Sequence, residues 1–169
     1  MRTQLNINGE LKDVEIENGK ITIIEPEKKA TGWERIKKNN KYCYWCGDDR
    51  VDKLREDCST ADNNLYSLAN YFSSEELFKN ISRMQTLLRN MFRWQAENDE
   101  PINRGRETQC KYYISYDHKT NDFQTLSGKY INLGFLPCFT TVEKAKRCID
   151  VFRYELIWLF TKFKWRMDE

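Results

Sequence analysis

The sequence predicts an α+β protein, in which a three-stranded β-meander precedes two tandem strand–strand–strand–helix repeats with long amphipathic helices. Three observations support this prediction. Two Asn-Gly dipeptides lie near the N-terminus, and two aromatic segments begin with Lys-Tyr. In two places a phenylalanine followed by two hydroxyl residues precedes a long segment with apolar residues at helical spacing. The expected domains are the meander at 1–26, a first repeat at 33–98 and a second repeat at 108–169.

The meander is predicted from its turns and from its alternation. Asn8-Gly9 and Asn18-Gly19 separate three short segments, and Asn-Gly favours a two-residue hairpin turn because both central positions need positive φ. Aliphatic residues alternate with polar ones in each segment, which gives each strand one apolar face. Three short strands bury little surface, so we expect this sheet to pack on the rest of the chain or on a partner.

The first repeat is expected to contain three strands. The segment 41–45 is aromatic and strand-like, a turn at Gly47-Asp48-Asp49 follows, and 50–55 returns as a second strand. After a loop at 61–64, the segment from Leu65 to Phe72 is predicted as the third strand.

The helix of the first repeat is predicted over 73–97. Ser73 and Glu76 fit a capping box, in which the hydroxyl and the carboxylate each bond a backbone amide at the helix start. An apolar stripe with helical spacing follows, formed by Leu77, Phe78, Ile81, Met84, Leu88, Met91 and Phe92. Pro101 stops the helix.

The second repeat follows the same order of elements. Its strands are expected at 111–114, 123–126 and 130–136, with a turn at 117–122. Thr140 and Glu143 supply a second capping box for a helix over 141–165. The agreement between the two repeats indicates that one unit was duplicated. The alternative is coincidence, since capping boxes and aromatic strands are both common, but the order of elements agrees over a long stretch. Two such units would stack pseudo-symmetrically, each helix covering a small sheet.

Composition narrows the classes of function. The net charge of the 169 residues is only +2, whereas a non-specific nucleic-acid binder usually carries a larger basic excess. The longest apolar run, 156–160, is too short to span a bilayer, and the N-terminus lacks the apolar core of a signal peptide. We therefore expect a cytoplasmic protein without a membrane partner, whose six cysteines are thiols.

Catalytic and metal-binding groups are sparse. Cys43 and Cys46 have the spacing of half a zinc site, but no second Cys-x-x-Cys or His pair completes it, and zinc binding stays open. The single histidine, His118, lies in a predicted turn. There is no Walker loop or Gly-x-Gly-x-x-Gly motif. The sequence thus predicts a non-enzymatic protein with no cofactor and no metal ion.

Aromatic and basic residues suggest a binding surface. Tyr, Trp and Arg dominate interface hot spots, and basic residues beside rings also suit nucleotides. The predicted partner-binding residues are Trp33, Arg35, Lys37, Lys38, Tyr42, Tyr44, Arg104, Arg106 and Tyr112. The alternative interpretation is a solvated charged connector beside core aromatics.

The order of these segments resembles a group of small phage and prophage proteins of Gram-positive bacteria. The resemblance is carried by the meander, by Gly32-Trp33-Glu34-Arg35, by Asn70-Tyr71-Phe72-Ser73-Ser74-Glu75-Glu76, and by Phe139-Thr140-Thr141-Val142-Glu143 with the helix after it. It implies a phage accessory product acting in the bacterial host cell, a class that includes anti-CRISPR inhibitors of bacterial immunity.

The leading hypothesis is a phage-encoded binding protein that blocks a host defence effector, such as a CRISPR nuclease, by protein–protein contact, as a monomer or a homodimer. The alternative is a nucleic-acid or nucleotide-binding module that uses Arg35, Lys37, Lys38, Arg104 and Arg106 with nearby tyrosines. A minor virion component is the third possibility.

Overall fold

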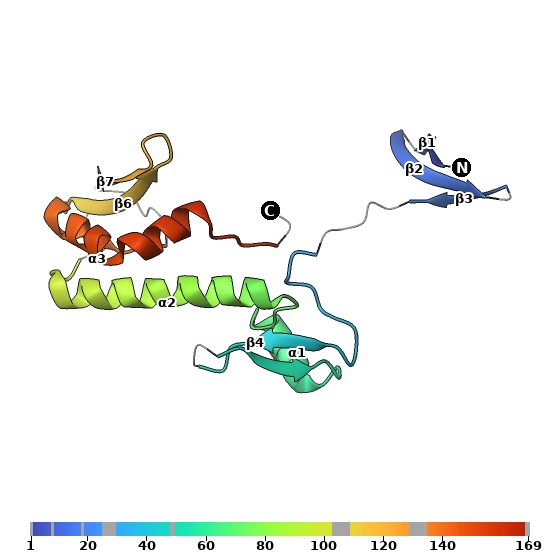
Figure 1. The fold of residues 1–169 in the computed structure, drawn as a ribbon, viewed down its shortest axis with the longest axis horizontal. Coiled ribbons are helices and arrows are strands. Elements are labelled where there is room, and N and C mark those ends of the chain that lie inside the picture. Colours follow the sequence, from blue (N-terminus) through green and yellow to red (C-terminus); the bar gives the residue numbers. More distant parts are fainter. Residues whose placement is uncertain are drawn as a thin grey trace. The chain divides into compact units, whose positions relative to one another are not determined.

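A computed structural model of the chain describes residues 2–7, 9–17, 19–24, 30–47, 50–102, 109–128 and 135–167. It is a mixed α+β structure, with three helices and several antiparallel sheets among these residues (Figure 1). The chain divides into two compact units, Met1–Ala30 and Thr31–Glu169. Among the helices of the described residues, none combines the length and apolar character that a bilayer crossing requires.

The first unit is the predicted β-meander. Strands β1 (Arg2–Ile7), β2 (Glu10–Glu17) and β3 (Lys20–Ile23) pair antiparallel in the order β1-β2-β3. Ile7 lies opposite Glu10 and Glu17 opposite Lys20, so each turn has two residues, as predicted. Gly9 and Gly19 have φ of 88° and 77°, which only glycine adopts at no steric cost.

The second unit begins with a small hairpin. Strands β4 (Lys41–Tyr44) and β5 (Asp52–Arg55) pair antiparallel, and Phe72 forms an isolated bridge to Cys43 on the other side of β4. The predicted strand over 65–72 is therefore wrong except at its last residue. Thr60–Ser67 forms helix α1 instead, because Ser59 and Asp62 make a capping box that sequence reasoning had assigned to a loop.

The other sheet of the second unit has the order β7-β6-β8. Its strands are β6 (Lys111–Asp117), β7 (Asp122–Gly128) and the short β8 (Cys138–Phe139), all antiparallel. The first two agree with the predicted strands at 111–114 and 123–126. The predicted strand at 130–136 falls largely outside the described residues.

Two long helices complete the second unit. Helix α2 spans Glu75–Asn98 and helix α3 spans Val142–Thr161, and they lie side by side and antiparallel (Figure 1). The predicted helix over 73–97 is confirmed nearly to the residue, whereas α3 ends earlier than the predicted 165. After α3 the chain reaches the start of the second unit, where the Met167 amide donates to the Thr31 carbonyl oxygen at 2.9 Å.

Both helix caps lie one residue later than predicted. Ser74 and Thr141 are the N-caps, and their hydroxyls accept from the amides of Leu77 and Lys144. The residues expected to cap have other partners, because the Ser73 hydroxyl donates to Glu34 and the Thr140 hydroxyl donates to Asp99. The competing carboxylates are distant in sequence, so spacing alone did not reveal them.

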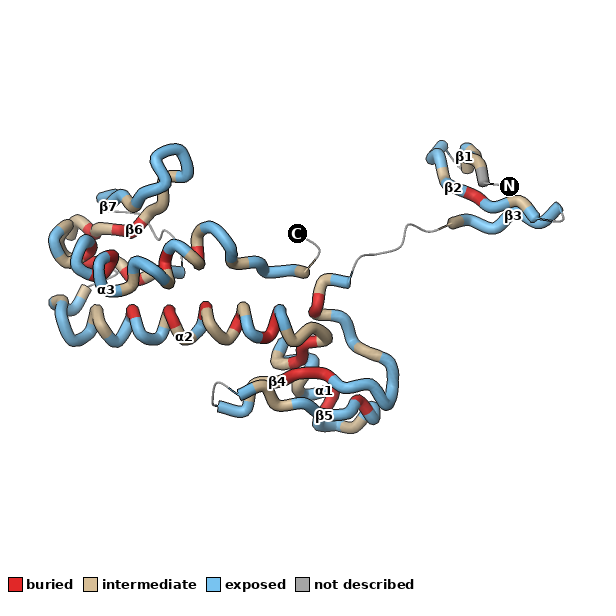
Figure 2. Tube along the Cα trace, viewed as in Figure 1, coloured by how far each residue is buried: buried red, intermediate tan, exposed pale blue. Residues whose placement is uncertain are grey.

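Helix α2 supplies the centre of the core. Its buried residues repeat along one side of the helix (Figure 2) and pack between the β4 hairpin and α3. The core joins residues of both sheets, including Cys43 and Phe72 from one and Ile114 and Phe139 from the other. The second unit is thus built around a single hydrophobic core.

Replacing Ile81 by aspartate tests this core. Ile81 is 4% exposed, so Ile81→Asp buries an unpaired carboxylate and should lower the free energy of unfolding by at least about 3 kcal/mol. Gln85→Asp, at an exposed position of the same helix, should change it by no more than about 0.5 kcal/mol. Urea denaturation followed by tryptophan fluorescence measures both. Equal stability of the two variants would contradict the assigned core face.

Candidate functional site

The described residues that were predicted to bind a partner differ in their exposure. Tyr42 is 0% exposed, so its ring belongs to the interior and the prediction that it contacts a partner is wrong. Trp33 is half-buried against Phe72, and its indole N–H donates to the Trp165 carbonyl oxygen at 2.8 Å. Tyr44 in β4 is half-buried as well.

The remaining predicted residues are scattered. Lys37 and Lys38 are exposed in the segment before β4, and Tyr112 is half-buried in β6, opposite Ser127 and Phe139. Arg104 and Arg106 lie outside the described residues. Among the described residues, Tyr112 therefore belongs to a different sheet from Tyr42 and Tyr44.

Arg35 instead belongs to a polar network beneath the first hairpin. Its guanidinium donates two hydrogen bonds to the carboxylate of Glu56, from Nε to Oε2 at 3.2 Å and from Nη2 to Oε1 at 2.9 Å. The hydroxyl of Tyr71 donates to the same carboxylate at 2.8 Å. Glu56 is fully buried, so these bonds compensate the loss of its hydration.

Two stacked tyrosines link this carboxylate to a second one. The rings of Tyr42 and Tyr71 lie 3.9 Å apart between centroids and are almost parallel. The Tyr42 hydroxyl donates to Asp62 at 2.6 Å, and Asp62 also accepts from the backbone amides of Asp57 and Ser59 at 3.0 Å. The network joins the segment before β4, the hairpin and helix α1.

The charges of this network are fixed at neutral pH. The Arg35 guanidinium, helped by the Tyr71 hydroxyl, lowers the pKa of Glu56 to about 2. Burial, together with donation to Glu56, raises the pKa of Tyr71 to about 12. The bond from Tyr42 likewise lowers the pKa of Asp62. The hydrogen bonds of the network thus favour the ionised carboxylates and the neutral tyrosine hydroxyls.

The two cysteines that suggested zinc are held differently. Cys43 is buried, which raises the pKa of its thiol, while the exposed thiol of Cys46 donates to the Asp52 carboxylate at 2.6 Å. Across the described residues, no group of three or more His, Cys, Asp or Glu side chains is placed to hold a metal ion. His118 is exposed and contacts the ring of Tyr116 edge-on.

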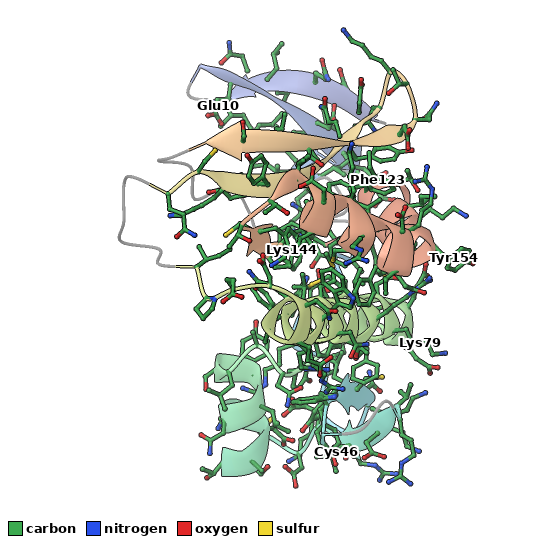
Figure 3. All side chains as sticks on the ribbon, turned by 90° about the vertical axis from the view of Figure 1, so that its left-hand side faces the viewer. Glu10, Cys46, Lys79, Phe123, Lys144 and Tyr154 are labelled. Atoms are coloured by element: carbon green, nitrogen blue, oxygen red, sulfur yellow. The ribbon has the colours of Figure 1, made fainter. Side chains whose placement is uncertain are left out.

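A surface formed by helices α2 and α3 carries aromatic, apolar and basic side chains, which are common in protein-binding sites. We define the two-helix face by Lys79 and Arg83 of α2 and by Val151, Tyr154 and Trp158 of α3. Tyr154 is 78% exposed and Val151 is 59% exposed. Tyr154 and Lys79 extend on the same side of the second unit (Figure 3). Val151, Tyr154 and Trp158 recur on one side of α3. Exposed apolar side chains that adjoin one another in this way are candidates for burial by a partner, whereas a single exposed one is ordinary.

Arg83 organises this face. Its guanidinium bonds Glu155 of α3 through Nε at 2.7 Å and Nη2 at 3.1 Å. It also lies 4.1 Å from the centroid of the Trp158 ring and 5.9 Å from that of Tyr154. The Glu155 carboxylate raises the pKa of Arg83, so the cation is permanent and is held in place between the helices.

A groove of about 470 Å³ runs beside these residues. Phe78 and Leu87 of α2 and Phe152 of α3 supply its apolar lining. Its polar lining comes from Lys79, Ser82, Arg83, Thr86, Asn90 and Glu155. An apolar depression with a few polar groups around it can take an apolar side chain and orient the segment that carries it.

Sequence reasoning missed the two-helix face. The helix over 141–165 was analysed for its core stripe, and Val151 and Tyr154 are apolar or aromatic residues that do not belong to that stripe. Such residues on the outer side of an amphipathic helix were the available signal. The partner residues Arg83 and Glu155 are far apart in sequence, so their pairing had no local signature.

A scan of family models and searches of curated proteins and of solved structures found no match to this chain.

The charge on Glu56 should make stability depend on pH. Its pKa falls from an ordinary 4.5 to about 2 in the folded state, so its contribution is complete above about 4.5 and is lost as the pH falls towards 2. Glu56→Gln should lower the free energy of unfolding at neutral pH by about 1–3 kcal/mol, and this difference should shrink in acid. Urea denaturation at several pH values measures it. Parallel pH profiles for the two proteins would refute the assignment.

Proposed function

We propose that this chain is a non-enzymatic binding protein that inhibits a bacterial host defence effector by protein–protein contact, and that the two-helix face makes the contact. The observation that carries the proposal is the exposure of Tyr154 and Val151 beside the Arg83–Trp158 pair. Tyr, Trp and Arg are the residues over-represented in interface hot spots.

Preorganisation supports this assignment. Arg83 is already held by Glu155 and by two aromatic rings, and both helices are anchored in the core. A partner that binds this face therefore orders few additional side chains, and ordering each flexible side chain costs roughly 0.5–1.5 kcal/mol. The adjacent groove offers a place for one apolar anchor of the partner.

The nature of the partner comes from the resemblance to small phage and prophage proteins. That resemblance suggests a phage-encoded product in the host cytoplasm, directed at a defence effector such as a CRISPR nuclease. It is independent of the two-helix face, which supports protein binding without specifying the target.

The proposal includes an origin by duplication of a strand–strand–helix element. In each half the first strand of a hairpin is flanked on its other side by a phenylalanine that precedes the helix: Phe72 beside Cys43, and Phe139 beside Tyr112. This common order supports duplication. When the two Lys-Tyr segments are aligned, the strand position that pairs with the phenylalanine differs by one residue between the halves. Helix α1 also occurs within the first half. The halves have therefore diverged.

The nucleic-acid alternative has less support. Its residues included Arg35, which is committed to Glu56, and Tyr42, which is fully buried and unavailable for stacking on a base. Base stacking needs an accessible ring face.

Two matched substitutions test the proposed contact. Tyr154→Ala removes an exposed ring from the two-helix face, whereas Leu68→Ala removes a side chain that is 76% exposed after helix α1. Neither is in the core, so both variants should fold. Tyr154→Ala should weaken capture of the partner by about tenfold or more, which corresponds to a hot-spot loss above about 1.4 kcal/mol. Leu68→Ala should have no effect.

The measurement is quantitative affinity capture from lysate of a host bacterium, with binding constants determined for the recovered protein. Equal binding by both variants would move the contact away from the two-helix face. Recovery of nucleic acid instead of protein, with affinity that falls steeply as salt rises, would favour the alternative.

A further inference from the structure

The β-meander has one apolar face and one polar face. The register places Thr3, Leu5 and Ile7 of β1, Lys12, Val14 and Ile16 of β2, and Ile21 and Ile23 of β3 on the same side of the sheet. The opposite side carries mainly polar and charged residues, including Gln4, whose amide donates to Asp13 at 2.9 Å, together with the exposed Leu11. One face is therefore suited to water and the other to burial.

The apolar face is covered unevenly within its own unit. Val14 at its centre is 0% exposed, but Ile21 and Ile23 on the edge strand are 55% and 45% exposed. The described part of this unit contains three strands and no helix or second sheet. Removing Ile21 and Ile23 from water requires an apolar surface on this side of the sheet, because burial of apolar surface is favourable.

We propose that this face packs against the same face of a second copy of the chain, forming a two-layered homodimer through the meander. An apolar face without excess charge is complementary to itself, which a two-fold contact requires. The charged residues on this side, Glu10 and Lys12, have opposite signs and lie 3.5 Å apart. Two copies related by a two-fold axis can bring Lys12 of each beside Glu10 of the other.

The small area of the apolar face indicates a weak dimer. Strands about 4.8 Å apart with residues about 3.4 Å apart give three strands a projected area of roughly 300 Å². Two such faces bury less than about 1,000 Å² in total, which is typical of weak or transient contacts. The dimer should accordingly form at high protein concentration and dissociate on dilution.

The proposal does not depend on the two-helix face. Its test uses the full chain and two variants that differ only in the side of β3 that receives a charge. Ile21→Lys places an ammonium on the apolar face, whereas Thr22→Lys places it on the opposite face, at a position that is also exposed.

Sedimentation velocity from low micromolar to several hundred micromolar should show a concentration-dependent dimer for the wild-type chain and for Thr22→Lys. Ile21→Lys should raise the dissociation constant of the dimer by about tenfold or more. All five tryptophans lie in the second unit, so their fluorescence confirms that this unit is unaffected.

NMR of the wild-type chain tests the dimer without any substitution, and therefore also applies if Ile21→Lys unfolds the meander. Isoleucine methyl signals of Ile7, Ile16, Ile21 and Ile23 should shift with protein concentration, while those of Ile81 and Ile149 in the second unit stay constant. A monomer at every concentration would overturn the proposal. So would concentration-dependent shifts confined to the second unit, or equal dimer affinity of the two lysine variants.

Discussion

The second unit depends on the burial of helix α2 from two sides. One part of its surface covers the β4 hairpin, and another packs against α3, which in turn covers the sheet of β6, β7 and β8. Neither sheet is large enough to be stable alone. Because the core is continuous from Phe72 to Phe139 through this helix, loss of α2 packing removes the cover of both sheets.

The ends of the two helices are joined by a buried carboxylate. Asp99 caps the C-terminus of α2, where a negative charge is unfavourable by itself. It lies at the N-terminus of α3, where it accepts from the Thr140 amide at 2.8 Å and from the Lys144 ammonium at 2.9 Å. These donors outweigh the effect of burial and lower the pKa of Asp99. The antiparallel order of the helices thus brings the C-terminus of α2 to the N-terminus of α3, where Asp99 and Lys144 carry opposite charges.

Local chemistry made part of this fold predictable from the sequence. The Asn-Gly turns specify the meander because they need positive φ at fixed positions, and the apolar stripes specify the long helices. The errors arose where a distant residue decided the outcome. Glu34 and Asp99 accept from the hydroxyls of Ser73 and Thr140. The loop expected at 61–64 is a different case, because helix α1 begins at a local capping box formed by Ser59 and Asp62. Tyr42 is buried because Asp62 and Tyr71 satisfy its hydroxyl and ring.

The two proposed contacts lie in different units, which has a consequence for affinity. A dimer held by the meander presents two copies of the two-helix face. Against a target with two equivalent sites, the second contact forms within an already joined complex, and its effective concentration is set by the chain between the units. A weak meander contact is then sufficient, because binding of the target and dimerisation strengthen one another. Against a target with one site, the two contacts are independent, and a monomer binds as well as a dimer.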